Sequence, residues 1–555
     1  MLVDQQEAPS LLPSRDRHPA APVLLKCNDT PKAEFGGPGR AATYKPNCLK
    51  ASRRQLVPQR QSKRSTHTPV MASPDHSRRS ADSDEELGRS KLRGDRDWEF
   101  LVGTAISVYQ NSGGGGNNWS QFEEQRTRFG QPTIEGGQKC GKSNNFWEYF
   151  EEDIKRVVNL QSTCFRLSLE WSRIEPEEGK IDMEAVRHYH DIFDCLLKNN
   201  LKPIVTLHHF VHPLWFDNKG GFTNEANIPY FVKFCEIAFR EYHEKVHLWI
   251  TFNECNVMGF CGWLYGQFPP ALLGNFKLAG RHLLNQFRSH AAAYKAMKAL
   301  PGGRESHIGI VHNVMRYEVL RPEAFSARWV TPVVEWLNRV WATEVTLDYF
   351  RSGRFCWYSP WAPAMTAQDE MPGLDFVGMN YYGKVSIDWR YQSAAVPPGV
   401  MTDMPFQLDA LGLYQGLQLM STLNVPIYIT ETGIADAVGD RRPLWLQTYI
   451  PEVERAVRDG YDVRGLMYWT LVDNFEWAHG FSIKFGLYEW APGYGRKRVP
   501  RAATPLLAGI FKELPAEMAR AHARAVEERP YKQKAPHPSP QSVLDIHPLD
   551  ASHNV

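Results

Sequence analysis

The chain has 555 residues, of which 43% are hydrophobic and 12% aromatic, so it can bury one very large core or two ordinary ones. Its 64 basic and 62 acidic residues nearly cancel to a formal net charge of +2, which predicts neither a nucleic-acid partner nor a membrane-surface partner. We therefore expect a globular protein whose partner is a small molecule.

Residues 1–97 are rich in Pro, Ser, Arg and Gln and contain almost no aromatic residues. That composition buries too little apolar surface to offset the conformational entropy of folding, so we expect a disordered basic leader. An organelle transit peptide is the alternative, although the acidic Asp4 and Glu7 are unusual in one. At the other end, we assign 516–555 to a terminal helix, near 515–528, and a disordered, proline-containing tail.

The nine cysteines show no CxxC pair and no zinc-ligand spacing, which favours a reducing compartment. No apolar run approaches the roughly 18 residues that span a bilayer, and no secretory signal is visible at the N-terminus. The sequence therefore predicts an intracellular, cytoplasmic protein without an integral membrane segment, or an organellar one if the leader is a targeting signal. It leaves the oligomeric state open.

Residues 98–515 repeat one pattern, in which a short apolar run ends on polar residues and is followed by a helix-like segment. Clear helical spacing occurs, for example, over Met183–Asn199 and Gly280–Leu300. Near-continuous apolar strands are typical of a parallel sheet covered by helices. The predicted strands are 98–107, 162–171, 201–210, 246–254, 307–313, 374–382, 425–432 and 463–471.

Eight such βα units predict the α/β class and a single (β/α)8 barrel, the TIM barrel, with long βα loops. The alternative is a pair of smaller α/β domains that divide near 300–360, where the strand pattern is weakest. We favour the barrel because no low-complexity segment separates two domains there.

In a (β/α)8 barrel the active site lies at the carboxyl ends of the strands. Carboxylates, amides, an arginine, a histidine and indoles gather at the predicted strand ends, and sugars need such planar hydrogen-bonding groups together with aromatic faces. Two of the carboxylates, Glu254 and Glu431, end the fourth and seventh strands. Glycoside hydrolysis with retention needs two carboxylates about 5–5.5 Å apart.

The third strand ends on an HHxxH pattern, His208, His209 and His212, which could indicate a metal. No further ligand pattern accompanies it. We therefore expect no metal and no cofactor, and we expect structural roles for His208 and His212.

Six motifs in this region resemble glycoside hydrolase family 1, the β-glucosidase family. They are collinear, and each lies at a predicted strand end. The motifs are FLVGTAISVYQ (100–110), FRLSLEWSRIEP (165–176), TFNEC (251–255), DFVGMNYY (375–382), ITETG (429–433) and YWTLVDNFEWAHGFSIKFGL (468–487).

The resemblance implies that Glu254 is the catalytic acid/base and that Glu431 is the nucleophile. It also implies that Arg166 and Tyr382 hold Glu431. A nearby cation lowers the pKa of a carboxyl group, so Arg166 would keep Glu431 ionised, whereas Glu254 needs a raised pKa. Asn313 is a supporting candidate, either in the site or directly behind it.

The resemblance further implies a set of sugar-binding residues. Trp469 would stack beneath the sugar ring, and Gln110, His209, Asn253, Glu476 and Trp477 would bind its hydroxyls. An acidic residue at position 476 would repel a phosphate, which favours unphosphorylated glucose or galactose as the bound sugar.

We therefore expect a retaining β-glycosidase that hydrolyses terminal β-D-glycosyl residues through a glycosyl-enzyme intermediate. One alternative on the same scaffold is a transglycosylase that passes the sugar to a sugar or lipid acceptor. Another is a catalytically weak carbohydrate-binding protein.

Four features depart from the family pattern. They are Cys255 in place of proline, Thr432 in place of asparagine, Phe210-Val211 in place of Trp-Asp, and an extra loop at Ala491–Gly495. Proline would restrict the backbone just after Glu254, so Cys255 bears on how that carboxyl is placed. With KFGL (484–487) and DRRP (440–443), the departures are similar to an outlying branch that includes transglycosylating galactolipid enzymes.

Overall fold

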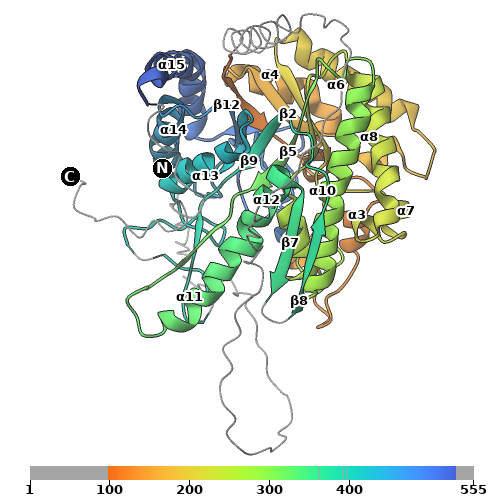
Figure 1. The fold of residues 1–555 in the computed structure, drawn as a ribbon. Coiled ribbons are helices and arrows are strands. Elements are labelled where there is room, and N and C mark those ends of the chain that lie inside the picture. Colours follow the sequence, from red (N-terminus) through yellow and green to blue (C-terminus); the bar gives the residue numbers. More distant parts are fainter. Residues whose placement is uncertain (1–97, 360–361, 391, 396, 533–555) are drawn as a thin grey trace, which may run out of the picture. The chain divides into compact units, whose positions relative to one another are not determined.

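The computed structural model describes residues 98–532, except 360, 361, 391 and 396 (Figure 1). The predicted leader, 1–97, and the tail from 533 onward lie outside the described residues. Among the helices that are described, none combines the length and the apolar character that crossing a bilayer requires.

Eight parallel strands close into one barrel, in the spatial order β1-β12-β11-β9-β5-β4-β3-β2. Each strand lies within one of the eight predicted ranges, so the predicted (β/α)8 barrel is confirmed. The two-domain alternative is wrong, because strands from both sides of 300–360 belong to the same closed sheet. The strands are β1 Leu101–Ala105, β2 Cys164–Ser168, β3 Lys202–His208, β4 Leu248–Phe252, β5 His307–Asn313, β9 Phe376–Asn380, β11 Ile427–Thr432 and β12 Val463–Trp469.

Side chains fill the inside of the barrel, because alternate residues of each strand point inward. One apolar cluster includes Leu101, Ile204, Ile250 and Met467, all at most 3% exposed. The strands also approach closely at Gly103 in β1, where a Cβ atom would lie 2.1 Å from the Cys164 carbonyl oxygen of β2. A larger residue at position 103 would therefore push these strands apart.

Long helices pack outside the barrel. In Figure 1, α8 and α10 lie side by side on one flank, and α13, α14 and α15 lie together on another. The helices outside the barrel include α4 Phe146–Asn159, α6 Met183–Lys198, α8 Ile228–Tyr242, α10 Phe276–Ala299, α12 Glu344–Ser352, α13 Ala410–Met420, α14 Arg442–Arg458 and α15 Ala503–Lys532.

Local signals explain where two of these helices begin. The Asp182 side chain accepts hydrogen bonds from the first turn of α6, which therefore starts where the sequence predicts. Helix α10 begins four residues before its predicted start, at Phe276, because the Asn275 side chain caps it through the Leu278 amide. Helix α15 also begins earlier than predicted, since its buried stripe starts at Ala503 and continues through Leu507 and Phe511.

Further strands and helices occupy the connections between the barrel strands, and the sequence pattern did not predict them. The parallel pair β6 Arg316–Val319 and β10 Lys384–Ile387 joins two βα connections. Two antiparallel pairs are β7 Arg354–Ser359 with β8 Ala362–Gln368, and β13 Tyr488–Glu489 with β14 Val499–Pro500. The short helices are α2 Val108–Ser112, α3 Asn118–Phe122, α5 Trp171–Ile174, α7 Leu214–Asp217, α9 Cys255–Trp263 and α11 Ala327–Trp336.

Candidate active site

Two glutamates lie at the carboxyl ends of β4 and β11. Glu254 follows β4 by two residues, and Glu431 is the last residue but one of β11. Their exposed fractions are 6% and 3%. Ionisable groups this deeply buried need compensating partners, so their neighbours decide what each can do.

Glu431 is held by a cation and a phenol. Arg166 Nη1 lies 2.5 Å from Glu431 Oε1, and the Tyr382 hydroxyl donates to Oε2 at 2.7 Å. Arg166 is itself fixed, because its Nε donates to Thr206 Oγ1 and its Nη1 donates to the Thr430 carbonyl. Both oxygens of the carboxylate therefore have a defined donor, and the group has little freedom to rotate.

Glu254 lies between two amides. Asn313 Nδ2 donates to Glu254 Oε1 at 2.6 Å, and Asn380 Nδ2 donates to the same oxygen at 2.8 Å. The second oxygen is not used in these bonds. Glu254 has a left-handed backbone with φ of 43°, which turns the chain from β4 directly into α9.

Burial raises the pKa of both carboxyls, and their neighbours modify it differently. Burial, and secondly the charge of Glu431, raise the pKa of Glu254 to about 8. Burial also raises the pKa of Glu431, while the Arg166 cation and the Tyr382 hydroxyl act in the opposite direction. The Arg166 cation therefore lowers the pKa of Glu431 as predicted, but burial of the carboxyl raises it by more. Glu254 retains its proton at neutral pH.

Asn253 and His209 form the next part of the site. Arg166 Nη2 donates to Asn253 Oδ1 at 2.7 Å. Because a guanidinium only donates, this bond fixes the amide orientation and turns Asn253 Nδ2 toward His209 Nε2 at 3.1 Å. Burial lowers the pKa of His209 well below its usual value, so the ring is neutral and its Nδ1 carries the proton. Within the described residues, that Nδ1 has no hydrogen-bond partner.

Gln110 and Glu476 form a second polar pair, with Gln110 Nε2 donating to Glu476 Oε2 at 3.2 Å. Burial, followed by the charges of Glu431 and Glu254, raises the pKa of Glu476 to about 8. In the described part of the chain, Gln110 Oε1 is buried without a hydrogen-bond partner. Unpaired buried polar atoms cost free energy, so Gln110 Oε1 and His209 Nδ1 are suited to receive ligand hydroxyls.

Aromatic rings line the same space. The His209 ring lies 5.8 Å from the Trp469 ring and 6.1 Å from the Trp477 ring, both at an interplanar angle of 26°. The Trp119 ring packs 4.6 Å from Trp477. The indoles therefore form a wall beside the carboxylates.

The structure brings all eleven residues predicted for the site into this one cluster. It adds two that the sequence reasoning did not assign, Asn380 and Thr206. Asn380 contacts both Asn253 and Glu254, and its Oδ1 accepts a hydrogen bond from Thr430. Its place at a strand end, inside the motif DFVGMNYY, was a usable signal. Thr206 lies inside β3 and gave no such signal.

Two of the HHxxH histidines, His208 and His212, form a hydrogen-bonded chain. His208 Nε2 lies 3.2 Å from His212 Nδ1, and His212 Nε2 lies 3.1 Å from Asp217 Oδ1. Over the residues that the structure describes, no three His, Cys, Asp or Glu side chains are grouped in a way that could hold a metal ion.

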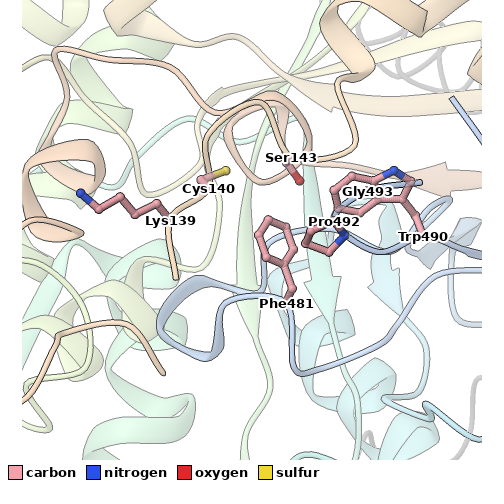
Figure 2. A pocket seen from close by; sticks show the side chains of 7 residues that line it. All are labelled: Lys139, Cys140, Ser143, Phe481, Trp490, Pro492 and Gly493. Atoms are coloured by element: carbon pink, nitrogen blue, oxygen red, sulfur yellow. The ribbon is translucent and has the colours of Figure 1, made fainter. Parts of the chain in front are cut away.

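A separate cavity of about 270 Å³ lies between the connections that follow β1 and β12 (Figure 2). The extra loop noted in the sequence, Ala491–Gly495, supplies Pro492 and Gly493 to its wall. None of the predicted site residues lines it. The lining residues are Lys139, Cys140, Ser143, Phe481, Trp490, Pro492 and Gly493.

The fold and the paired carboxylates define a (β/α)8 protein of the glycosidase type. Residues 96–504 match the model of Glycosyl hydrolase family 1, which is more than half of the chain. The chain belongs to that family, and the resemblance found in the six motifs is confirmed.

Several known proteins are similar along most of their length. A 1,4-beta-D-glucan glucohydrolase from Thermotoga neapolitana is 28% identical, covering 70% of this chain and 96% of the relative. A probable inactive beta-glucosidase 14 from Oryza sativa subsp. japonica is 27% identical, covering 70% and 86%. The solved beta-glycosidase from Pyrococcus horikoshii matches with a TM-score of 0.65 at 29% identity, covering 76% of this chain and 97% of that one.

Proposed function

We propose that this protein is a retaining β-glycosidase that hydrolyses terminal β-D-glycosyl residues. The observation that carries the proposal is the pair Glu254 and Glu431, in which one carboxyl is held by Arg166 and Tyr382 and the other keeps a proton near neutral pH. Glycoside hydrolysis with retention needs these two states at once.

In the first half-reaction, a Glu431 oxygen attacks the anomeric carbon while Glu254 gives its proton to the glycosidic oxygen. The bond between the anomeric carbon and the leaving oxygen breaks, and a covalent glycosyl-enzyme forms. Arg166 and Tyr382 aim the attacking carboxylate, because each donates to one of its oxygens.

In the second half-reaction, the negative charge of Glu431 has been consumed by the glycosyl bond. The loss of this charge lowers the proton affinity of Glu254, since the charge is the second cause of its raised pKa. Glu254 then accepts a proton from water, the water oxygen attacks the anomeric carbon, and Glu431 leaves as a carboxylate. Two inversions retain the β configuration.

The sugar itself would contact Gln110, His209, Asn253, Glu476 and Trp477, above the indole of Trp469. Two buried polar atoms without partners, Gln110 Oε1 and His209 Nδ1, support this placement because sugar hydroxyls can both donate and accept. A phosphorylated sugar is disfavoured because its phosphate would lie in the same pocket as the ionised Glu431. We therefore propose unphosphorylated glucosides or galactosides as substrates.

The test is a panel of 4-nitrophenyl β-glucoside and β-galactoside with natural acceptors, followed by NMR of the first anomer released. We expect nitrophenol release with the β anomer formed first. Transfer of the sugar to an acceptor would instead establish the transglycosylase. Correctly folded protein that turns over no β-glycoside would instead support a sugar-binding role. The test must allow for this outcome because one relative is described as probably inactive.

A further inference from the structure

The loop that follows the nucleophile strand is built around one buried acid. Asp436, five residues after Glu431, is fully buried and accepts hydrogen bonds from the backbone amides of Gly439, Arg441 and Arg442. The two arginines also pair with it through their side chains. The loop around Asp436 is therefore a rigid support next to Glu431.

Each arginine joins the loop around Asp436 to a different connection. Arg442 donates to the Lys484 carbonyl at 2.9 Å, in the connection after β12. Arg441 reaches the connection after β9, where its Nη1 donates to the Met401 carbonyl at 2.8 Å and its Nη2 lies 2.5 Å from Asp403 Oδ1. Asp403 adds two backbone links, because its amide donates to the Ala435 carbonyl and its Oδ2 accepts from the Ala437 amide.

The segment that Arg441 holds is the turn Met401–Phe406. Its own bonds close it, since the Thr402 amide donates to the Phe406 carbonyl and Thr402 Oγ1 bonds both Met404 and Phe406. The turn carries two half-buried apolar side chains toward the site. Met404 packs with the cluster that contains Trp469 and Tyr382, and the Phe406 ring lies 6.3 Å from the Tyr382 ring.

We propose that Arg441 is a positioning residue for leaving-group selection, and that it acts through Asp403 to hold the Met401–Phe406 turn beside the nucleophile. With the turn in place, Met404 and Phe406 present an apolar surface next to Tyr382, and a leaving group bound beside Glu431 would contact this surface. The substrate class it favours is a β-glycoside with an apolar leaving group. This inference rests on the proposed glycosidase function.

Arg441 acts at one remove from the reaction. Its guanidinium is bonded to Asp403, Asp436 and Met401, and the residues that hold Glu431 are Arg166 and Tyr382. Losing Arg441 should therefore change how a leaving group is bound, and it should leave the attack on the anomeric carbon unchanged.

The experiment compares the wild type with Arg441→Gln on three substrates that share the sugar chosen by the panel above. Octyl and methyl β-glycosides differ in apolar leaving-group surface, and the corresponding β-glycosyl fluoride uses the catalytic groups with almost no leaving-group contact. We expect kcat/KM for the octyl glycoside to fall about tenfold, mainly through KM, because a few methylene contacts are worth that much. The fluoride rate should stay within about twofold.

Three further variants make the result specific. Arg441→Lys should show an intermediate loss, because an ammonium can pair with Asp403 but cannot match the fork that also reaches Met401. Met404→Ser should reproduce the loss for the octyl glycoside while leaving the pair of Arg441 and Asp403 intact. Arg390→Gln is the matched control from the same connection, where the guanidinium lies 4.7 Å from the Trp389 ring centroid, and it should change neither rate.

The outcomes separate the two proposals. A wild type that turns over neither the fluoride nor any glycoside overturns the glycosidase function itself. An active wild type whose Arg441→Gln variant loses the fluoride and octyl rates equally overturns leaving-group positioning, and so does a variant that discriminates octyl from methyl as well as the wild type. Thermal unfolding of each variant checks folding, and Met404→Ser provides the test if Arg441→Gln does not fold.

Discussion

At the scale of single residues, the site gives two carboxyl groups of identical chemistry different neighbours. Glu431 has an arginine and a phenol as neighbours, whereas Glu254 has two neutral amides. A cation stabilises the ionised form, but neutral amides do not offset the burial of a charge that already faces another carboxylate. The proposed division into nucleophile and acid thus follows from the neighbours.

The role of Glu431 can be tested with Glu431→Gly. We expect hydrolysis to fall by at least about 10³-fold, because the variant has no group to attack the anomeric carbon. Azide should partly restore the rate by occupying the vacated space and attacking directly, and the product should be the α-glycosyl azide. A folded variant that azide does not restore would argue against the assignment.

Glu254→Ala tests the acid. Poor leaving groups should lose about 10²- to 10⁴-fold in rate, and activated dinitrophenyl glycosides far less, because only the former need a proton. In the wild type, activity should fall as the pH rises through about 8, where Glu254 loses its proton. This alkaline limb should flatten in the variant. Equal losses on both kinds of substrate, or an unchanged limb, would remove Glu254 as the acid.

At the scale of elements, the junction between β4 and α9 explains the most conspicuous departure from the family pattern. Cys255 is the first residue of α9 and is 2% exposed. The first amide of a helix has no partner within the helix, so this position accepts proline without losing a bond. The sharp turn at Glu254 is made by its own left-handed backbone, and a cysteine follows it without difficulty.

Cys255→Pro should therefore fold and keep its activity, with the free energy of unfolding within about 1 kcal/mol of the wild type. Cys261→Pro is the matched control, since it places the same change inside the same helix, where it removes a hydrogen bond and should cost about 3 kcal/mol or more. Chemical denaturation measures both. A large loss in Cys255→Pro would show that the thiol itself supports the junction.

At the scale of the whole barrel, the first and last βα units must meet for the sheet to close. Strand β1 pairs with β12, and Arg498, after β12, reaches Asp153 of α4 with both side chains 1% exposed. Arg498 also donates to the Asn144 carbonyl at 2.6 Å. This ion pair ties the connection after β12 to α4, the first of the long outer helices.

Arg498→Met should lower the free energy of unfolding by about 1–3 kcal/mol, because it removes one of the two cations that pair with the buried Asp153 carboxyl and leaves only Arg156, whose Nη1 lies 3.0 Å from Asp153 Oδ1. Adding Asp153→Asn should recover part of the loss by removing that charge. Urea unfolding of the two single variants and the double variant forms the cycle. Equal stability of Arg498→Met and the wild type would show that the pair does not hold the closure.

The sequence alone determined the strand number, the barrel and the family, and it predicted the eleven residues that the structure brings into one cluster. Apolar runs that end on polar residues are local patterns, and a parallel barrel places every strand end at one mouth. Helix ends were predicted less well. Helix α10, for example, begins about one turn before its predicted start because the Asn275 side chain caps it. Short strands such as β6 and β10 were not predicted because they form only through pairing with each other.

Only the tertiary structure decided how the site residues act on one another. Asn380 and Thr206 matter because the closed barrel sets β9 beside β11 and β3 beside β2, and no local pattern encodes those contacts. The same holds for the pKa of Glu254, which depends on burial and on a charge 177 positions away in the chain. Residue types are local, whereas desolvation and charge coupling belong to the packed fold.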